Sequence, residues 1–126
     1  MIIIPDIHGR DFWKKPVYEN LGKEHILFLG DYLDPYDYEG NPSWEGFPAL
    51  EQIVFLKEKN PDTITLLLGN HDLHYLSDEL YGGRFDSLHA ARNNNIFTVH
   101  AHLFNIAYLS DLGGMRFLFS HAGVIM

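Results

Sequence analysis

The chain has 126 residues, of which 46% are hydrophobic and 21% charged, so it is long enough for one domain with a single core. Nine Lys and Arg against 17 Asp and Glu give a net charge of −8, which argues against bulk nucleic-acid binding through the phosphate backbone. The absence of cysteine excludes a disulfide framework, a thiolate nucleophile and a Cys-based zinc site, and leaves His and carboxylate side chains as the strong metal ligands.

Targeting and membrane signals are not found in the sequence. The apolar start of the chain stops at Pro5, short of a secretory signal, and no segment has the length of a membrane span. We therefore expect one cytoplasmic domain over residues 1–126, with no membrane partner.

Three short apolar runs are typical of strands that are buried on both faces: residues 2–4, 26–29 and 64–68. The segments between them predict helices over about residues 12–21 and 48–59. Strand, helix, strand, helix, strand indicates an α/β fold with a parallel sheet and crossover helices.

The second half of the chain is less regular. It predicts short helices over residues 72–80, ending at Gly82-Gly83, and over 87–92, closed by Asn93-Asn94-Asn95. Residues 104–109 and 115–120 predict a hairpin, which brings the expected strands to five. The long irregular stretch 35–47, rich in aromatic residues, fits either a binding loop or a structural lid over the sheet edge.

Polar side chains that can bind metals stand where the predicted strands end. The four segments are Asp6-Ile7-His8-Gly9, Gly30-Asp31-Tyr32-Leu33-Asp34, Gly69-Asn70-His71-Asp72 and Ser120-His121-Ala122-Gly123. Taken singly, each segment is better explained by turn and helix-cap residues than by metal ligands. Because ligands bind beyond the carboxyl ends of parallel strands, the four segments together favour one site, and clustered carboxylates and imidazoles there favour a bound cation.

In order and approximate spacing, these segments resemble the first four motifs of the calcineurin-like metallophosphoesterases, which include relatives of Ser/Thr protein phosphatases. The resemblance runs from Asp6 to Gly123. It implies a metallophosphoesterase-like αββα sandwich that is C-terminally incomplete, so that residues 1–126 form the N-terminal portion of the full family fold.

The resemblance also implies a centre for two divalent metal ions. Asp6 and His8 would bind the first ion, Asn70 and His121 the second, and Asp31 would bridge the two with its two oxygens. Mixed imidazole, carboxylate and carboxamide ligands suit Mn, Fe, Zn or Ni, with no choice among them. In the family, a hydroxide shared by the two ions attacks the phosphate.

The implied activity is hydrolysis of phosphomonoesters, with protein phosphoserine or phosphothreonine among the candidate substrates. His71 would donate a proton to the leaving oxygen, and Asp34 would hold the other ring nitrogen of His71. Pro35 stands where the protein phosphatases of the family have an Arg that binds phosphate. Arg10 or Arg84 could replace that Arg, or both could be surface charges.

The fifth motif of the family, Gly-His-x-His, is absent before the chain ends at Met126. His100 and His102 have the His-x-His spacing but precede the fourth motif, so we interpret them as surface or turn residues. The alternative function is therefore a catalytically weak or inactive fold that binds a metal or a partner. The apolar end at residues 124–126 predicts either a longer natural protein or a homo-oligomer formed through an open sheet edge.

Overall fold

Four short parallel strands form the main sheet in this computed structural model, which describes residues 1–40, 46–77 and 82–122. The strands follow one another in the order β1 (Ile2–Ile4), β2 (Ile26–Phe28), β3 (Ile64–Leu67) and β4 (Phe104–Asn105). In the register of the sheet, Ile2 lies beside Ile26, and Ile26 beside Ile64. Every residue of β2 and β3 is buried, which confirms the prediction from their continuous apolar runs.

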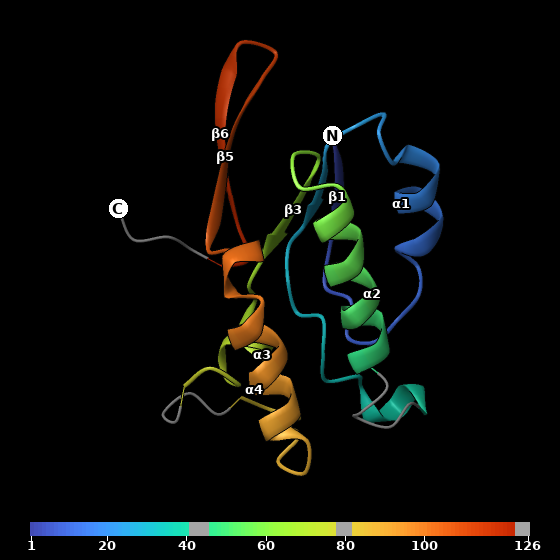
Figure 1. Cartoon of the computed structure of the whole chain (residues 1–126), viewed down its shortest axis with the longest axis vertical. Coiled ribbons are helices and arrows are strands. Elements are labelled where there is room, and N and C mark those ends of the chain that lie inside the picture. Colours follow the sequence, from blue (N-terminus) through green and yellow to red (C-terminus); the bar gives the residue numbers. More distant parts are fainter. Residues whose placement is uncertain (41–45, 78–81, 123–126) are drawn as a thin grey trace.

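Helices connect these strands and cover the sheet (Figure 1). The α-helices are α1 (Lys14–Asn20), α2 (Gly46–Lys59), α3 (Asn70–Leu73) and α4 (Ala90–Val99), and the 3-10 helices are η1 (Asp37–Glu39) and η3 (Ala101–Leu103). Helices α1 and α2 confirm the two predicted crossovers. Helix α2 buries Leu50, Ile53 and Val54 against the sheet, because these residues share one helical face.

The described residues contain no helix that is long and apolar enough to cross a membrane. The α/β fold class is confirmed, with a parallel sheet and covering helices as expected of a metallophosphoesterase sandwich.

A second, two-stranded sheet is formed by the hairpin of β5 (Ala107–Leu112) and β6 (Met115–Ser120), which projects away from α1 and α2 (Figure 1). The prediction of one strand over residues 104–109 is wrong, because the chain divides there. Phe104 packs in the core and joins β3, whereas Ala107 begins the hairpin. Gly113 and Gly114 both have positive φ and close a two-residue turn, so β5 extends to Leu112, beyond the predicted end, while β6 has the predicted bounds.

Helix α4 also differs from its prediction, since the asparagine run lies inside the helix instead of closing it. Asn93 is buried, and the side chain of Asn94 donates to the carbonyl of Tyr75 at 2.8 Å. With their side chains engaged elsewhere, these residues do not compete for the helix backbone. Ile96 and Phe97 then extend the helix into the core.

Helix α3 starts earlier than predicted, at Asn70, and its assigned residues end at Leu73. The end of the helix predicted over 72–80, the loop residue Trp44, and the apolar terminus at 124–126 lie outside the described residues. Within the described part of the chain, β5 and β6 pair only with each other, and Leu109, Met115 and Leu118 are exposed on them. Association through this edge stays a prediction.

Candidate metal centre

All seven site residues predicted from the sequence meet at one end of the main sheet. They follow the strands as expected: Asp6 and His8 after β1, Asp31 and Asp34 after β2, Asn70 and His71 after β3, and His121 after β6. The structure thus brings together segments that are up to 115 residues apart in the chain.

Asp31 lies at the middle of this cluster. Its Oδ2 is 3.5 Å from Nε2 of His8 and 3.3 Å from Nε2 of His121. Its Oδ1 accepts the backbone N–H of His71 at 2.9 Å. One oxygen therefore faces both imidazoles, while the other accepts a hydrogen bond from the start of α3. The role of Asp31 as a bridge between two ions stays a prediction.

Asp6 and Asn70 extend the cluster to either side. The carboxylate of Asp6 lies 3.9 Å from Nε2 of His8 and 3.7 Å from Nδ1 of His121. The Oδ1 of Asn70 lies 3.1 Å from Nε2 of His121. Among the groups that could hold a metal ion, Asp6, Asp31 and His121 each offer a ligand atom within 4.8 Å of the others.

Backbone carbonyls fix the orientation of both imidazoles. Nδ1 of His8 lies 2.7 Å from the carbonyl of Leu33, and Nδ1 of His121 lies 2.9 Å from the carbonyl of Leu29. A carbonyl can only accept, so we assign the proton to Nδ1 in each ring, which leaves Nε2 with a free lone pair toward Asp31. Burial lowers the pKa of His8 and favours this neutral, metal-binding form.

Asp34 and His71 form the predicted pair beside this cluster. Nδ1 of His71 donates to Oδ2 of Asp34 at 2.9 Å. Asp34 is fully buried, and its Oδ1 accepts the hydroxyl proton of Tyr75, a group that burial keeps protonated by raising its pKa. The two side chains are thus hydrogen-bonded to each other, and their catalytic roles stay predictions.

Sequence reasoning missed His74. Its Nδ1 accepts the backbone N–H of Gly82 at 3.1 Å. Its Nε2, however, lies 2.7 Å from Oδ2 of Asp34, the same oxygen that His71 contacts. The sequence did contain a signal, because His71 and His74 are three residues apart and such residues share one face of a helix.

Asp72 joins the loops that carry the candidate ligands. Its buried carboxylate accepts backbone N–H groups from Gly69 at 2.8 Å, Asp31 at 2.7 Å and Tyr32 at 3.1 Å. The loops after β2 and β3 approach so closely that a Cβ at Gly69 would collide with the Asp31 carboxylate. Gly69 and Asp72 therefore hold these two strand exits together.

The backbone is strained at this site. Among the described residues, the non-glycine residues with positive φ are His8, Asp31, Asp34 and Arg84, with φ of 46°, 56°, 63° and 59°. Such conformations are costly and persist where the surrounding structure holds them, which is common at functional sites. All four surround the same cluster.

The two candidate phosphate-binding arginines differ in their surroundings. Arg10 makes a two-pronged ion pair with Glu39, with distances of 2.8 and 3.1 Å. Arg84 instead reaches the cluster: its Nε donates to the carbonyl of Asp34 at 3.1 Å, and its Nη2 lies 3.4 Å from Nε2 of His71. The geometry therefore distinguishes the two arginines, which sequence reasoning left open.

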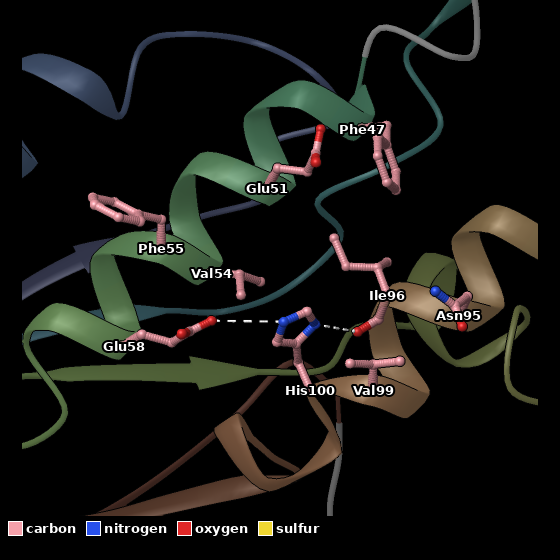
Figure 2. Close-up of a pocket in the computed structure, with 9 residues that line it drawn as sticks. All are labelled: Phe47, Glu51, Val54, Phe55, Glu58, Asn95, Ile96, Val99 and His100. Atoms are coloured by element: carbon pink, nitrogen blue, oxygen red, sulfur yellow. Dashed lines mark hydrogen bonds and ion pairs between the residues drawn. The ribbon is translucent and has the colours of Figure 1, made fainter.

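Two of the hollows in the described part of the chain help to delimit the site. One, of about 170 Å³, is lined by Asn70 and His121 together with apolar side chains that include Leu73 and Ile106, so it adjoins the candidate centre. The other, of about 290 Å³, is a groove between α2 and α4 (Figure 2). The groove lies on the helices, away from the strand exits, and is not part of the candidate centre.

The remaining histidines discussed above lie outside the cluster, as predicted. His100 bonds the carbonyl of Ile96 at 2.9 Å and lies 3.6 Å from Glu58 across the groove (Figure 2). His102 is exposed. Neither faces the strand exits.

Comparisons with known proteins agree with this geometry. A model of the calcineurin-like phosphoesterase family matches residues 1–125. The chain is 27% identical to the serine/threonine-protein phosphatase 4 catalytic subunits of Eremothecium gossypii over 130 residues and of Saccharomyces cerevisiae over 128 residues. These alignments cover 97% of this chain and 38% of each relative, so the chain spans well under half the length of the curated relatives it matches. No solved structure matches the chain.

Proposed function

The chain belongs to the calcineurin-like phosphoesterase family, and we propose that it hydrolyses phosphomonoesters with two divalent metal ions bound at the strand exits. The observation that carries the proposal is the position of Asp31. One carboxylate oxygen faces the free Nε2 atoms of His8 and His121, which come from different sheets. Without a cation, this arrangement would bring acceptor atoms together with nothing between them.

The donor atoms fit two cations that share Asp31. Asp6, His8 and Asp31 would hold one ion, and Asp31, Asn70 and His121 the other. Imidazole, carboxylate and amide ligands suit Mn, Fe, Zn or Ni. When bound, two such ions would activate a water molecule near neutral pH and polarise the phosphoryl oxygens.

His71 would act as the general acid. The activated water would lose a proton to solvent as its oxygen bonds to phosphorus, the ester P–O bond would break, and the leaving oxygen would take the proton from Nε2 of His71. The products are an alcohol and inorganic phosphate, and His71 regains its proton from solvent. Asp34 stabilises the protonated ring through its hydrogen bond to Nδ1, at 2.9 Å.

Protein phosphoserine and phosphothreonine are our candidate physiological substrates. The support is the similarity to two serine/threonine-protein phosphatase catalytic subunits. The small apolar hollow beside Asn70 and His121 offers a wall for the organic part of such a substrate.

A simple assay tests the proposal. The purified chain with MnCl₂ should hydrolyse p-nitrophenyl phosphate, and Asp31→Asn should abolish the activity while Asp111→Asn, an exposed change on the hairpin, should not. A wild-type protein as inert as Asp31→Asn would refute the proposal and favour the alternative of a metal- or partner-binding fold without turnover.

A further inference from the structure

Two tyrosine rings lead from the candidate centre outward to solvent. The Tyr36 ring meets the His8 ring edge-on, with the ring centres 5.1 Å apart, and the Tyr38 ring lies 5.2 Å from the Tyr36 ring. Tyr36 is half-buried, whereas Tyr38 is 81% exposed. Both belong to the aromatic-rich stretch for which the sequence left a binding loop open.

The backbone that carries these rings is held against the neighbouring loop. The carboxylate of Glu39 makes a two-pronged ion pair with Arg10, at 2.8 and 3.1 Å. A Cβ at Gly9 would come within 2.8 Å of the Pro35 ring, so the loops after β1 and β2 are in direct contact. The backbone at Tyr38 is therefore already ordered, which reduces the entropy that a ligand would lose it on binding.

The free aromatic surface here is that of Tyr38. The Tyr36 ring is already used within the protein, because Cζ of Arg84 lies 3.8 Å and Cζ of Arg10 5.2 Å from its centre. The ring of Tyr38 is left in water and gains little from burial in the core. Exposed tyrosine rings suit binding surfaces, because they offer a large apolar face with little loss of side-chain freedom.

We propose that Tyr38 binds an aromatic side chain of the phosphorylated protein, two or three residues away from the phosphorylated residue. The inference rests on the proposed function, because it adds a sequence preference to the candidate phosphoserine and phosphothreonine substrates. Two successive ring separations of 5.1 and 5.2 Å lead from His8 to Tyr38. An extended segment advances about 3.3 Å per residue, so two or three residues of substrate cover this distance.

The charges at this side of the site favour an uncharged ring over a charged partner. Arg10 is neutralised by Glu39, whereas Arg84 forms no ion pair with a carboxylate in the described part of the chain. A Lys or Arg of the substrate would be repelled by Arg84 and by the proposed metal ions. An acidic side chain would meet the negative face of the Tyr38 ring, whereas an aromatic ring can stack on it or meet it edge-on.

The test uses phosphoserine peptides in an alanine background, with Phe, Leu or Arg placed at each position from three residues before to three residues after the phosphoserine. With MnCl₂ present, Phe at a position two or three residues away should give the wild type a KM about 3- to 10-fold lower than Leu at the same position. The values of kcat for the Phe and Leu peptides should be equal, because the contact is the same in the ground state and the transition state.

Variants of Tyr38 assign the preference to its ring. Tyr38→Ala should remove the difference in KM between the Phe and Leu peptides, and Tyr38→Phe should keep it. Tyr38→Leu, which keeps an apolar side chain without the ring, serves as the second variant if Tyr38→Ala fails to fold. The matched control Tyr18→Ala replaces another exposed tyrosine, on α1, and should leave the preference intact.

The outcomes separate this inference from the proposed function. Equal KM values for Phe and Leu at every position, a larger gain with Arg than with Phe, or a preference that persists in Tyr38→Ala would overturn the role of Tyr38. If the wild type cleaves neither the peptides nor p-nitrophenyl phosphate, the proposed function fails. In that case, and also if only the peptides stay uncleaved, calorimetry with the same peptides on the Mn²⁺-loaded protein decides: tighter binding of the Phe peptide that is lost in Tyr38→Ala supports the inference, and equal binding of the Phe and Leu peptides overturns it.

Discussion

Asp72 is the residue whose replacement tests most sharply how the loops of the candidate centre are held. Its fully buried carboxylate accepts three backbone N–H groups, two on Oδ2 and one on Oδ1. Asp72→Ala leaves all three donors without a partner. Each buried, unsatisfied donor costs about 1–3 kcal/mol.

Burying the charged carboxylate of Asp72 also has a free-energy cost, so the loss of stability expected for Asp72→Ala is smaller than the summed penalties. Burial raises the pKa of Asp72 well above its ordinary value, so keeping the charged form inside the protein at neutral pH has a cost of its own. We therefore expect Asp72→Ala to lower the free energy of unfolding by about 3–5 kcal/mol, toward the low end of the summed penalties. Asp72→Asn keeps the two bonds on one oxygen and turns an NH₂ toward Tyr32, for a loss of about 1–3 kcal/mol.

Urea unfolding followed by circular dichroism measures both losses. Small domains are stable by about 5–15 kcal/mol, so Asp72→Asn should remain folded and Asp72→Ala should be marginal. Asp111→Asn, an exposed change, should alter the free energy of unfolding by less than about 0.5 kcal/mol. The reasoning is refuted if Asp72→Asn and Asp111→Asn unfold at the same urea concentration.

Two further predictions concern the histidines beside Asp34. His71→Asn should lower kcat on phenyl phosphate by about 10²–10⁴-fold, with the amount of bound Mn²⁺ unchanged. The loss on p-nitrophenyl phosphate should be smaller, because its leaving group needs little protonation. Equal losses on the two substrates would argue against His71 as a general acid. Burial lowers the pKa of His74, so as the pH falls the unfolded chain binds the proton first. The stability that His74 contributes is complete above its usual pKa of about 6.5 and is lost as the pH falls from there toward the lowered value. In EDTA, the Tm should therefore fall as the pH is lowered from about 7 to about 5. His74→Gln should flatten this pH dependence, whereas His102→Gln, an exposed change, should not. Parallel curves of Tm against pH for the two variants would contradict the prediction.

The main sheet could be predicted because each of its first three strands is a continuous apolar run that ends at small and polar residues. Such runs are informative since both faces of a parallel sheet are covered. The asparagine run led to a wrong prediction of the helix end. Asn94 stays inside the helix because its side chain bonds the carbonyl of Tyr75, and such a tertiary contact cannot be inferred from local helix propensity. The division of the predicted strand at Ile106 likewise depends on tertiary contacts, because β4 pairs with β3 and β5 pairs with β6.

Most of the candidate centre could be predicted for a topological reason: parallel strands deliver their following loops to the same edge. His74 and Arg84 could not be placed this way. Arg84 reaches the cluster only through a left-handed backbone and contact with Tyr36, and neither feature has a sequence pattern of its own. The sharing of one Asp31 oxygen likewise depends on a hydrogen bond from the backbone of His71.

The number of Mn²⁺ ions bound per chain tests the central claim most directly. Equilibrium dialysis followed by elemental analysis should find two ions in the wild type and neither ion held tightly in Asp31→Asn, because Asp31 faces the ligands on both sides. Mn²⁺ binding that is absent from the wild type, or that is unchanged by Asp31→Asn, would contradict a shared metal centre at the strand exits.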